Sequence, residues 1–216
     1  MENNFKLLLF TFFLICLGVG FYFSSFLIQF ITSLLPSEIK LVSLNPSDGF
    51  LVYFWSALSI GFLLFSFFGG IYLWYYSKNI LYSHERKILR NNIIPIVILF
   101  ATGFLFGIHM YVNIVLKYFL EINSLLGLEN IWSINVVFVS ALMIGFSLGI
   151  SFQLPIIIRS LIKFKIIKKD IFVKNKLIVL VVLLILSAII TPPDMISQLM
   201  VAGPLYTLFI LSLIKI

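Results

Sequence analysis

The side chains that could do chemistry in this sequence are few and far apart. No nucleophile stands beside a base at a catalytic spacing, and there is no glycine-rich phosphate loop or cluster of metal-ligand residues. A haem held between two imidazoles needs both histidines at a similar depth, whereas His84 lies in a charged segment and His109 in an apolar one. The sequence therefore predicts no enzyme activity and no cofactor, and its polar residues are candidates for recognition.

The first candidate for recognition is Glu85, which lies among basic residues. One interpretation is a surface ion pair with Arg86, Lys87 or Arg90, which would stabilise the protein by about 0–1 kcal/mol. The other is that the carboxylate accepts the arginines of a partner as a bidentate acceptor. The sequence leaves both alternatives open.

Gln153 is an amide side chain inside a charge-free run, where polar groups are costly. It either forms an interhelical hydrogen bond, which contributes roughly 0.6–2 kcal/mol, or lines a cavity for a guest or a partner helix. Pro155 removes one backbone donor, so we expect a kink that exposes carbonyl groups beside Gln153.

The segment 191–194 reads Thr-Pro-Pro-Asp and fits the start of a helix. Thr191 would be the N-cap, Pro192 would occupy the first helical position, and Asp194 would complete a capping box. Capping explains Asp194, and a functional polar contact is the alternative.

The composition determines the solvent in which these residues must act. Of the 216 residues, 62% are apolar and only 11% are charged, against roughly 25% charged in a soluble domain. Such a chain cannot cover a globule with polar surface, which excludes a soluble enzyme, a nucleic-acid module and a disordered linker. We therefore predict an integral membrane protein whose solvent is the lipid bilayer.

Six apolar runs suggest how the chain crosses the bilayer. Backbone groups in lipid must bond internally, and the runs are continuously apolar rather than alternating, so we predict helices rather than a β-barrel. The fold class is an all-α polytopic membrane protein, with one domain over residues 1–216. The fifth helix is only about 21 Å long, against a hydrocarbon core of roughly 30 Å. The predicted spans are 7–31, 50–76, 92–116, 131–158, 177–190 and 196–214.

The charges of the connecting segments alternate in sign. The net charge is −1 over 32–49, +3 over 77–92, −1 over 117–131 and +6 over 159–176. The positive-inside rule places the second and fourth segments, with both termini, on the cytoplasmic or matrix side. The lysines between residues 163 and 176 are most simply a topogenic and anionic-lipid patch, and no nucleic-acid partner is expected.

Three stretches carry a resemblance to a known family. The sequence around Tyr82-Ser83-His84-Glu85-Arg86, the sequence Gly149-Ile150-Ser151-Phe152-Gln153-Leu154-Pro155, and Thr191-Pro192-Pro193-Asp194 followed by Gln198 resemble landmark motifs of TatC. TatC is the six-span core subunit of the twin-arginine, or Sec-independent, protein translocase. The resemblance covers nearly the whole chain from about Leu41 onward.

The resemblance implies a receptor scaffold for folded passengers. The family binds twin-arginine signal peptides on its cytoplasmic face, recruits single-span TatA/TatB-like subunits, assembles from several copies, and uses the proton-motive force. It implies that Glu85, with His84 and Arg86, belongs to the signal-peptide site. Members usually begin with His-Leu-x-Glu-Leu-Arg, a segment in place of which this sequence offers only Glu2 as a carboxylate.

The resemblance also assigns the remaining polar positions. Gln153, beside Pro155, matches an intramembrane position that holds Glu or Gln, and Pro192, Asp194 and Gln198 match residues where partner helices dock. The composition and the absence of a targeting signal favour an organelle-encoded member in the mitochondrial inner membrane, with the plastid thylakoid or a bacterial inner membrane as alternatives. The other hypotheses are a small transporter or channel and an accessory respiratory subunit.

Overall fold

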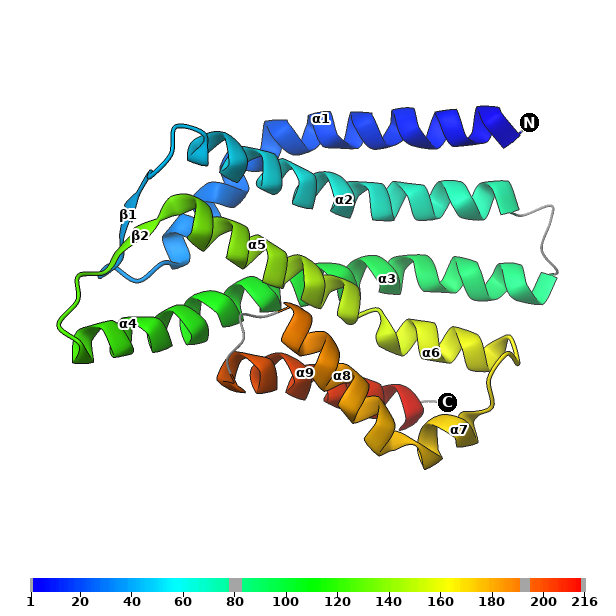
Figure 1. Ribbon diagram of the computed structural model, residues 1–216. Coiled ribbons are helices and arrows are strands. Elements are labelled where there is room, and N and C mark those ends of the chain that lie inside the picture. Colours follow the sequence, from blue (N-terminus) through cyan, green and yellow to red (C-terminus); the bar gives the residue numbers. More distant parts are fainter. Residues whose placement is uncertain (1, 78–82, 191–194, 215–216) are drawn as a thin grey trace.

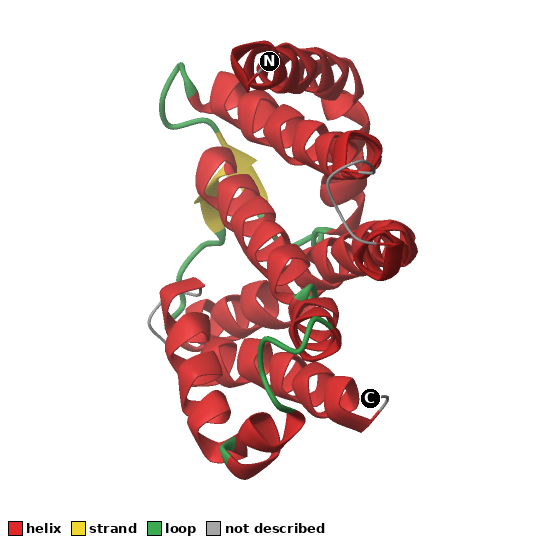
Figure 2. Cartoon of the chain, turned by 90° about the vertical axis from the view of Figure 1, so that its right-hand side faces the viewer, coloured by secondary structure: helices red, strands yellow, loops and turns green. Residues whose placement is uncertain are grey.

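The computed structural model describes residues 2–77, 83–190 and 195–214, and this part of the chain is mostly helical (Figure 1). Figure 2 shows its two short strands as one small patch in an otherwise helical chain. The elements are α1 Glu2–Leu34, β1 Lys40–Val42, α2 Asp48–Ser77, α3 Ser83–Met110, the π-helix η1 Tyr111–Val115, α4 Leu116–Leu125, β2 Ile131–Ser133, α5 Ile134–Ser151, α6 Leu154–Lys163, α7 Lys169–Lys174, α8 Lys176–Ile190 and α9 Met195–Ile214.

Within the described residues, four helical stretches are long and apolar enough to cross a bilayer. They run from Phe10 to Leu34, from Asp48 to Gly69, from Arg90 to Leu125 and from Ile134 to Lys163. Two further apolar helices are shorter, one within α8 and one within α9. Figure 1 shows this short pair beside the long helices, next to α6.

The third long stretch is one helical run from Ser83 to Leu125, further than the predicted span 92–116. Lys117 and Glu121 end the apolar run, but both residue types favour helix, so charge alone does not stop the helix. The run includes the π-helix η1, a wider turn that is rare in proteins and was not predicted from the sequence.

The fourth long stretch is divided into α5 and α6 by a turn at Phe152 and Gln153. Pro155 has no N–H for the Ser151 carbonyl, and its ring clashes with a carbonyl four residues earlier. The N–H of Gln153 bonds to the Ile150 carbonyl at 2.9 Å, which tightens the turn. The break therefore lies two to three residues before the proline that causes it.

Glycines set the distance between α3 and α5. A Cβ on Gly107 would lie 2.6 Å from the Cα of Gly145, and a Cβ on Gly145 would lie 3.0 Å from the Phe104 carbonyl oxygen. Helices in lipid associate through such close packing at small residues. The crossing holds α5, and with it the break before α6, against α3.

The end opposite the N-terminus is held together by a parallel strand pair and a carboxylate. β1 pairs with β2 in the register Lys40 to Ile131. Asp48, at the start of α2, accepts hydrogen bonds on Oδ2 from the N–H groups of Leu44 at 2.9 Å and Asn45 at 3.1 Å, and from the Ser133 hydroxyl at 3.4 Å. The two segments with a net charge of −1 therefore lie together.

Candidate functional site

The predicted signal-binding residues lie at one end of the molecule. Glu2 is the first residue of α1, and His84, Glu85 and Arg86 are in the first turn of α3. Figure 1 shows both helices starting at the same end, opposite the strands, with α2 between them. The fold thus brings to one end two positions, 2 and 85, that are far apart in the sequence and that both hold glutamate.

Gln153 connects α3 to α5 through hydrogen bonds of its side chain. Its Nε2 donates to the Ile96 carbonyl of α3 and to the Gly149 carbonyl of α5, both at 3.2 Å. The second bond has a clear cause, because the turn has moved the backbone N–H of Gln153 from Gly149 to Ile150. The side-chain amide therefore satisfies the carbonyl that the break releases.

The interhelical hydrogen bond, one of the two alternatives for Gln153, is present for its amide nitrogen. The Oε1 atom is buried and has no hydrogen-bond partner among the described residues. Pro155, also buried, lies in the first turn of α6. The sequence did predict a kink that leaves a carbonyl beside Gln153, but it did not identify Ile96 as the partner on the facing helix.

A second polar contact joins the same two stretches nearer the end that carries Glu85. The Asn92 side-chain amide donates to the Ser160 hydroxyl at 2.9 Å. Sequence reasoning missed this pair, although an amide and a hydroxyl at the ends of two apolar runs were a usable signal. Ile96 is eleven residues beyond Glu85, or about 16 Å along α3, so the two bonds hold the part of α3 next to its first turn against α5 and α6.

The docking residues expected near α8 and α9 are only partly described. Gln198 donates through Nε2 to the Leu184 carbonyl at 3.0 Å and so ties α9 to α8. Pro192 and Asp194, with the predicted capping box, lie outside the described residues. The remaining candidate from the sequence, His109, is exposed and contacts the amide of Asn113 one turn later at 3.1 Å.

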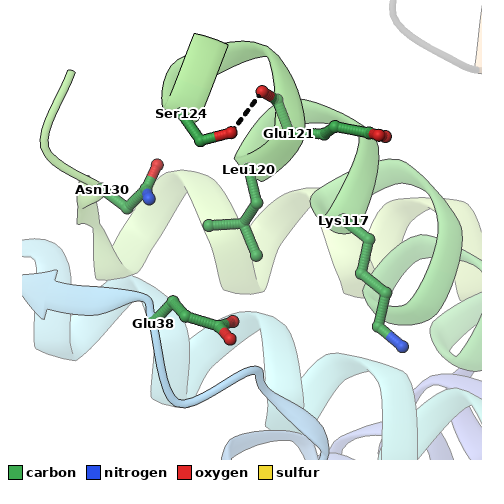
Figure 3. Close-up of a pocket in the computed structure, with 6 residues that line it drawn as sticks. All are labelled: Glu38, Lys117, Leu120, Glu121, Ser124 and Asn130. Atoms are coloured by element: carbon green, nitrogen blue, oxygen red, sulfur yellow. Dashed lines mark hydrogen bonds between the residues drawn. The ribbon is translucent and has the colours of Figure 1, made fainter. Parts of the chain in front are cut away.

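A cavity of about 450 Å³ lies at the opposite, strand-bearing end. Figure 3 shows Glu38 facing the α4 residues Lys117 and Leu120 across it. Its two carboxylates, Glu38 and Glu121, belong to the segments of net negative charge, and Figure 1 shows the strands at the end opposite the start of α3. This cavity is therefore not part of the site at the start of α3.

Known proteins resemble the chain over its whole length. The family described as "Sec-independent protein translocase protein (TatC)" matches residues 4–204. The TatC protein of Carboxydothermus hydrogenoformans is 32% identical over 89% of this chain and 78% of its own, and that of Listeria innocua is 30% identical over 99% and 87%. A crystal structure of the twin-arginine translocase receptor TatC superimposes with a TM-score of 0.81 at 25% identity, covering 99% of this chain and 95% of that one. The chain belongs to the TatC family and is a membrane-embedded subunit of the Sec-independent protein translocase, not an enzyme.

Proposed function

We propose that this chain receives twin-arginine signal peptides at the end where α1 and α3 begin. The observation that carries the proposal is the placement of Glu85 in the first turn of α3, at the same end as Glu2. A helix N-terminus favours an ionised carboxylate, the form that accepts a guanidinium in bidentate fashion. His84 and Arg86 flank Glu85 and complete the contact surface for the signal peptide.

Photo-crosslinking tests this role of Glu85. A signal peptide with paired arginines, carrying a photoreactive group beside them, is added to membranes that contain the full-length chain. Glu85→Gln should lower crosslinking several-fold while membrane insertion is unchanged, because it removes the charge and keeps the shape. Glu129→Gln makes the same change at the strand-bearing end and should have no effect. Equal crosslinking by the wild type and Glu85→Gln would exclude Glu85 from the site.

Gln153 acts in this scheme as a positioning residue. Its bonds to Ile96 and Gly149 connect α3, which begins beside Glu85, to the break before α6. Loss of these bonds should weaken signal binding through the placement of α3 and leave the charge of the site unchanged. A variant at Gln153 should therefore change the affinity for twin-arginine and twin-lysine signal peptides by the same factor, whereas Glu85→Gln should lower the preference for arginine.

Single-span TatA/TatB-like subunits are proposed to dock on the short α8–α9 pair, with Gln198 of α9 and with Pro192 and Asp194, which precede α9 in the sequence. α8 supports this with exposed Val181, Ile185 and Ile189, which are spaced four residues apart and share one face. Transport would use the proton-motive force in an assembly of several copies. Ile185 replaced by a photoreactive residue should crosslink to a single-span subunit, and failure to do so while the complex is intact would place docking elsewhere.

The proposed topology has six spans, with both termini on the cytoplasmic or matrix side. The chain has one cysteine, Cys16, so a Cys16→Ser background permits single-cysteine mapping. Ser43→Cys should react with an impermeant maleimide from outside, and Lys168→Cys only after the membrane is opened. We place the protein in the mitochondrial inner membrane, with the plastid thylakoid or a bacterial inner membrane as alternatives that cell fractionation distinguishes.

A further inference from the structure

The segment that joins α6 to α8 has a surface that exposes both lysines and large apolar side chains. We call this surface the basic belt. Ile166 is 66% exposed and Ile171 is 51% exposed, although both are large apolar residues. Residues 159–176 contain seven basic residues and a single acidic residue, Asp170. The belt consists of the exposed residues Lys163, Lys165, Ile166, Lys168, Ile171, Val173, Lys174 and Lys176.

Lys165 adopts a backbone conformation that lysine rarely takes. It ends α6 with a φ of 58°, and the N–H groups of Lys165 and Ile166 bond to the carbonyls of Ile162 and Leu161, both at 3.0 Å. This is the Schellman arrangement, in which the left-handed residue is usually glycine because a Cβ is unfavourable there. A lysine at this position points to a requirement for its side chain, since glycine would fit the backbone better.

α7 is fixed so that the apolar belt residues stay outside. Phe172 packs against Phe209 of α9, with ring centroids 6.3 Å apart. Its neighbours Ile171 and Val173 are exposed on the same short helix, because packing of Phe172 turns them away from the core. The exposure of these two residues is thus part of the packed fold.

The start of α8 gives the depth of the belt in the bilayer. α8 has 15 residues, or about 22 Å, which is shorter than a hydrocarbon core of roughly 30 Å. Leu177 is 75% exposed directly after Lys176, so a fully apolar surface begins next to the last belt lysine. A water-soluble acidic partner would account for the lysines but not for the isoleucines between them. A bilayer surface accounts for both, because lysine stems lie along acyl chains while the ammonium groups reach the headgroups.

We infer that the basic belt binds anionic phospholipid headgroups, with Lys165 held in place by the α6 terminus to contact a headgroup phosphate. Ile166 and Ile171 add apolar contact with the acyl chains, whereas Val173, two residues after Ile171, is exposed on the other flank of α7. The inference is independent of signal-peptide binding, because none of these residues belongs to the predicted signal site.

Lipid selectivity in reconstituted bilayers tests the inference. Full-length protein is placed in phosphatidylcholine bilayers with traces of spin-labelled phosphatidylglycerol or phosphatidylcholine, and the motionally restricted fraction of each is measured. The wild type should prefer phosphatidylglycerol, and high salt should remove the preference by screening. K165Q/K168Q should lower the preference, by up to about fivefold for each lysine. K40Q/K117Q makes the same charge change on exposed lysines at the opposite end and should leave the preference unchanged.

Lys165→Gly separates the role of the side chain from that of the backbone. It should lower phosphatidylglycerol preference while the thermal unfolding midpoint stays equal or rises, because glycine suits the left-handed position. Inorganic phosphate should displace the lipid no better than chloride at equal ionic strength. An unchanged preference in K165Q/K168Q, an equal loss in K40Q/K117Q, or selective displacement by inorganic phosphate would each overturn the inference.

Discussion

Gln153→Leu is the most direct test of how the break before α6 is held. The substitution keeps a side chain of similar size but removes the Nε2 donor, which bonds at 3.2 Å to both Ile96 and Gly149. An interhelical hydrogen bond in a membrane averages about 0.6 kcal/mol and reaches about 1.7 kcal/mol. The Gly149 carbonyl would also lose its side-chain donor, at a cost of about 1–3 kcal/mol for an unsatisfied buried group. Leucine also removes the buried Oε1, which has no partner among the described residues, and this offsets part of the loss. We expect a net destabilisation of about 2 kcal/mol.

The assay for Gln153→Leu is equilibrium unfolding of the purified chain in mixed micelles, followed by the fluorescence of its tryptophans. Gln29→Leu is the matched control, because Gln29 is an exposed amide on α1 and its replacement should change the free energy of unfolding little. If both variants unfold at the same detergent fraction, the Gln153 bonds do not hold the break and the positioning role proposed for this residue is wrong.

Three further substitutions test other contacts that hold the helices and the strand-bearing end together. In Gly107→Ala the added Cβ should clash with α5 and cost about 1–3 kcal/mol of stability, offset in part by a helix-propensity gain of about 1 kcal/mol. In Gly18→Ala the added Cβ meets nothing within 4 Å, so only the gain should appear. Thermal unfolding of the two variants compares them directly. Asp48→Asn should lower the unfolding midpoint and raise hydrogen exchange at Leu44 and Asn45, whose N–H groups it binds. Gln198→Leu should increase protease access between α8 and α9, and an unaltered digest would mean that the bond at 3.0 Å to Leu184 does not hold the pair.

The sequence predicted the features that follow from the apolar character of the chain and from the charges of its loops. Apolar runs identified the helices, and the loop charges grouped the segments around residues 40–42 and 131–133, which the structure pairs as β1 and β2. The strands β1 and β2, their register and the π-helix η1 were not predicted, because they depend on packing between distant parts of the chain. The contact between Asn92 and Ser160 was missed for the same reason, since the two residues are 68 positions apart.

The break before α6 links the proposed signal site to the proposed lipid-binding surface. The turn before Pro155 takes the backbone N–H of Gln153 away from the Gly149 carbonyl, and the Gln153 side-chain amide is a neutral donor that reaches this carbonyl without placing a charge in lipid. Because the same amide also reaches Ile96, the direction of α6 is fixed relative to α3. α6 then ends at the Lys165 turn and begins the basic belt, while α3 starts beside Glu85. A single polar side chain thus connects the position of the proposed signal site to that of the proposed lipid-binding surface, so Gln153→Leu should weaken both, whereas Glu85→Gln and K165Q/K168Q should each affect only one.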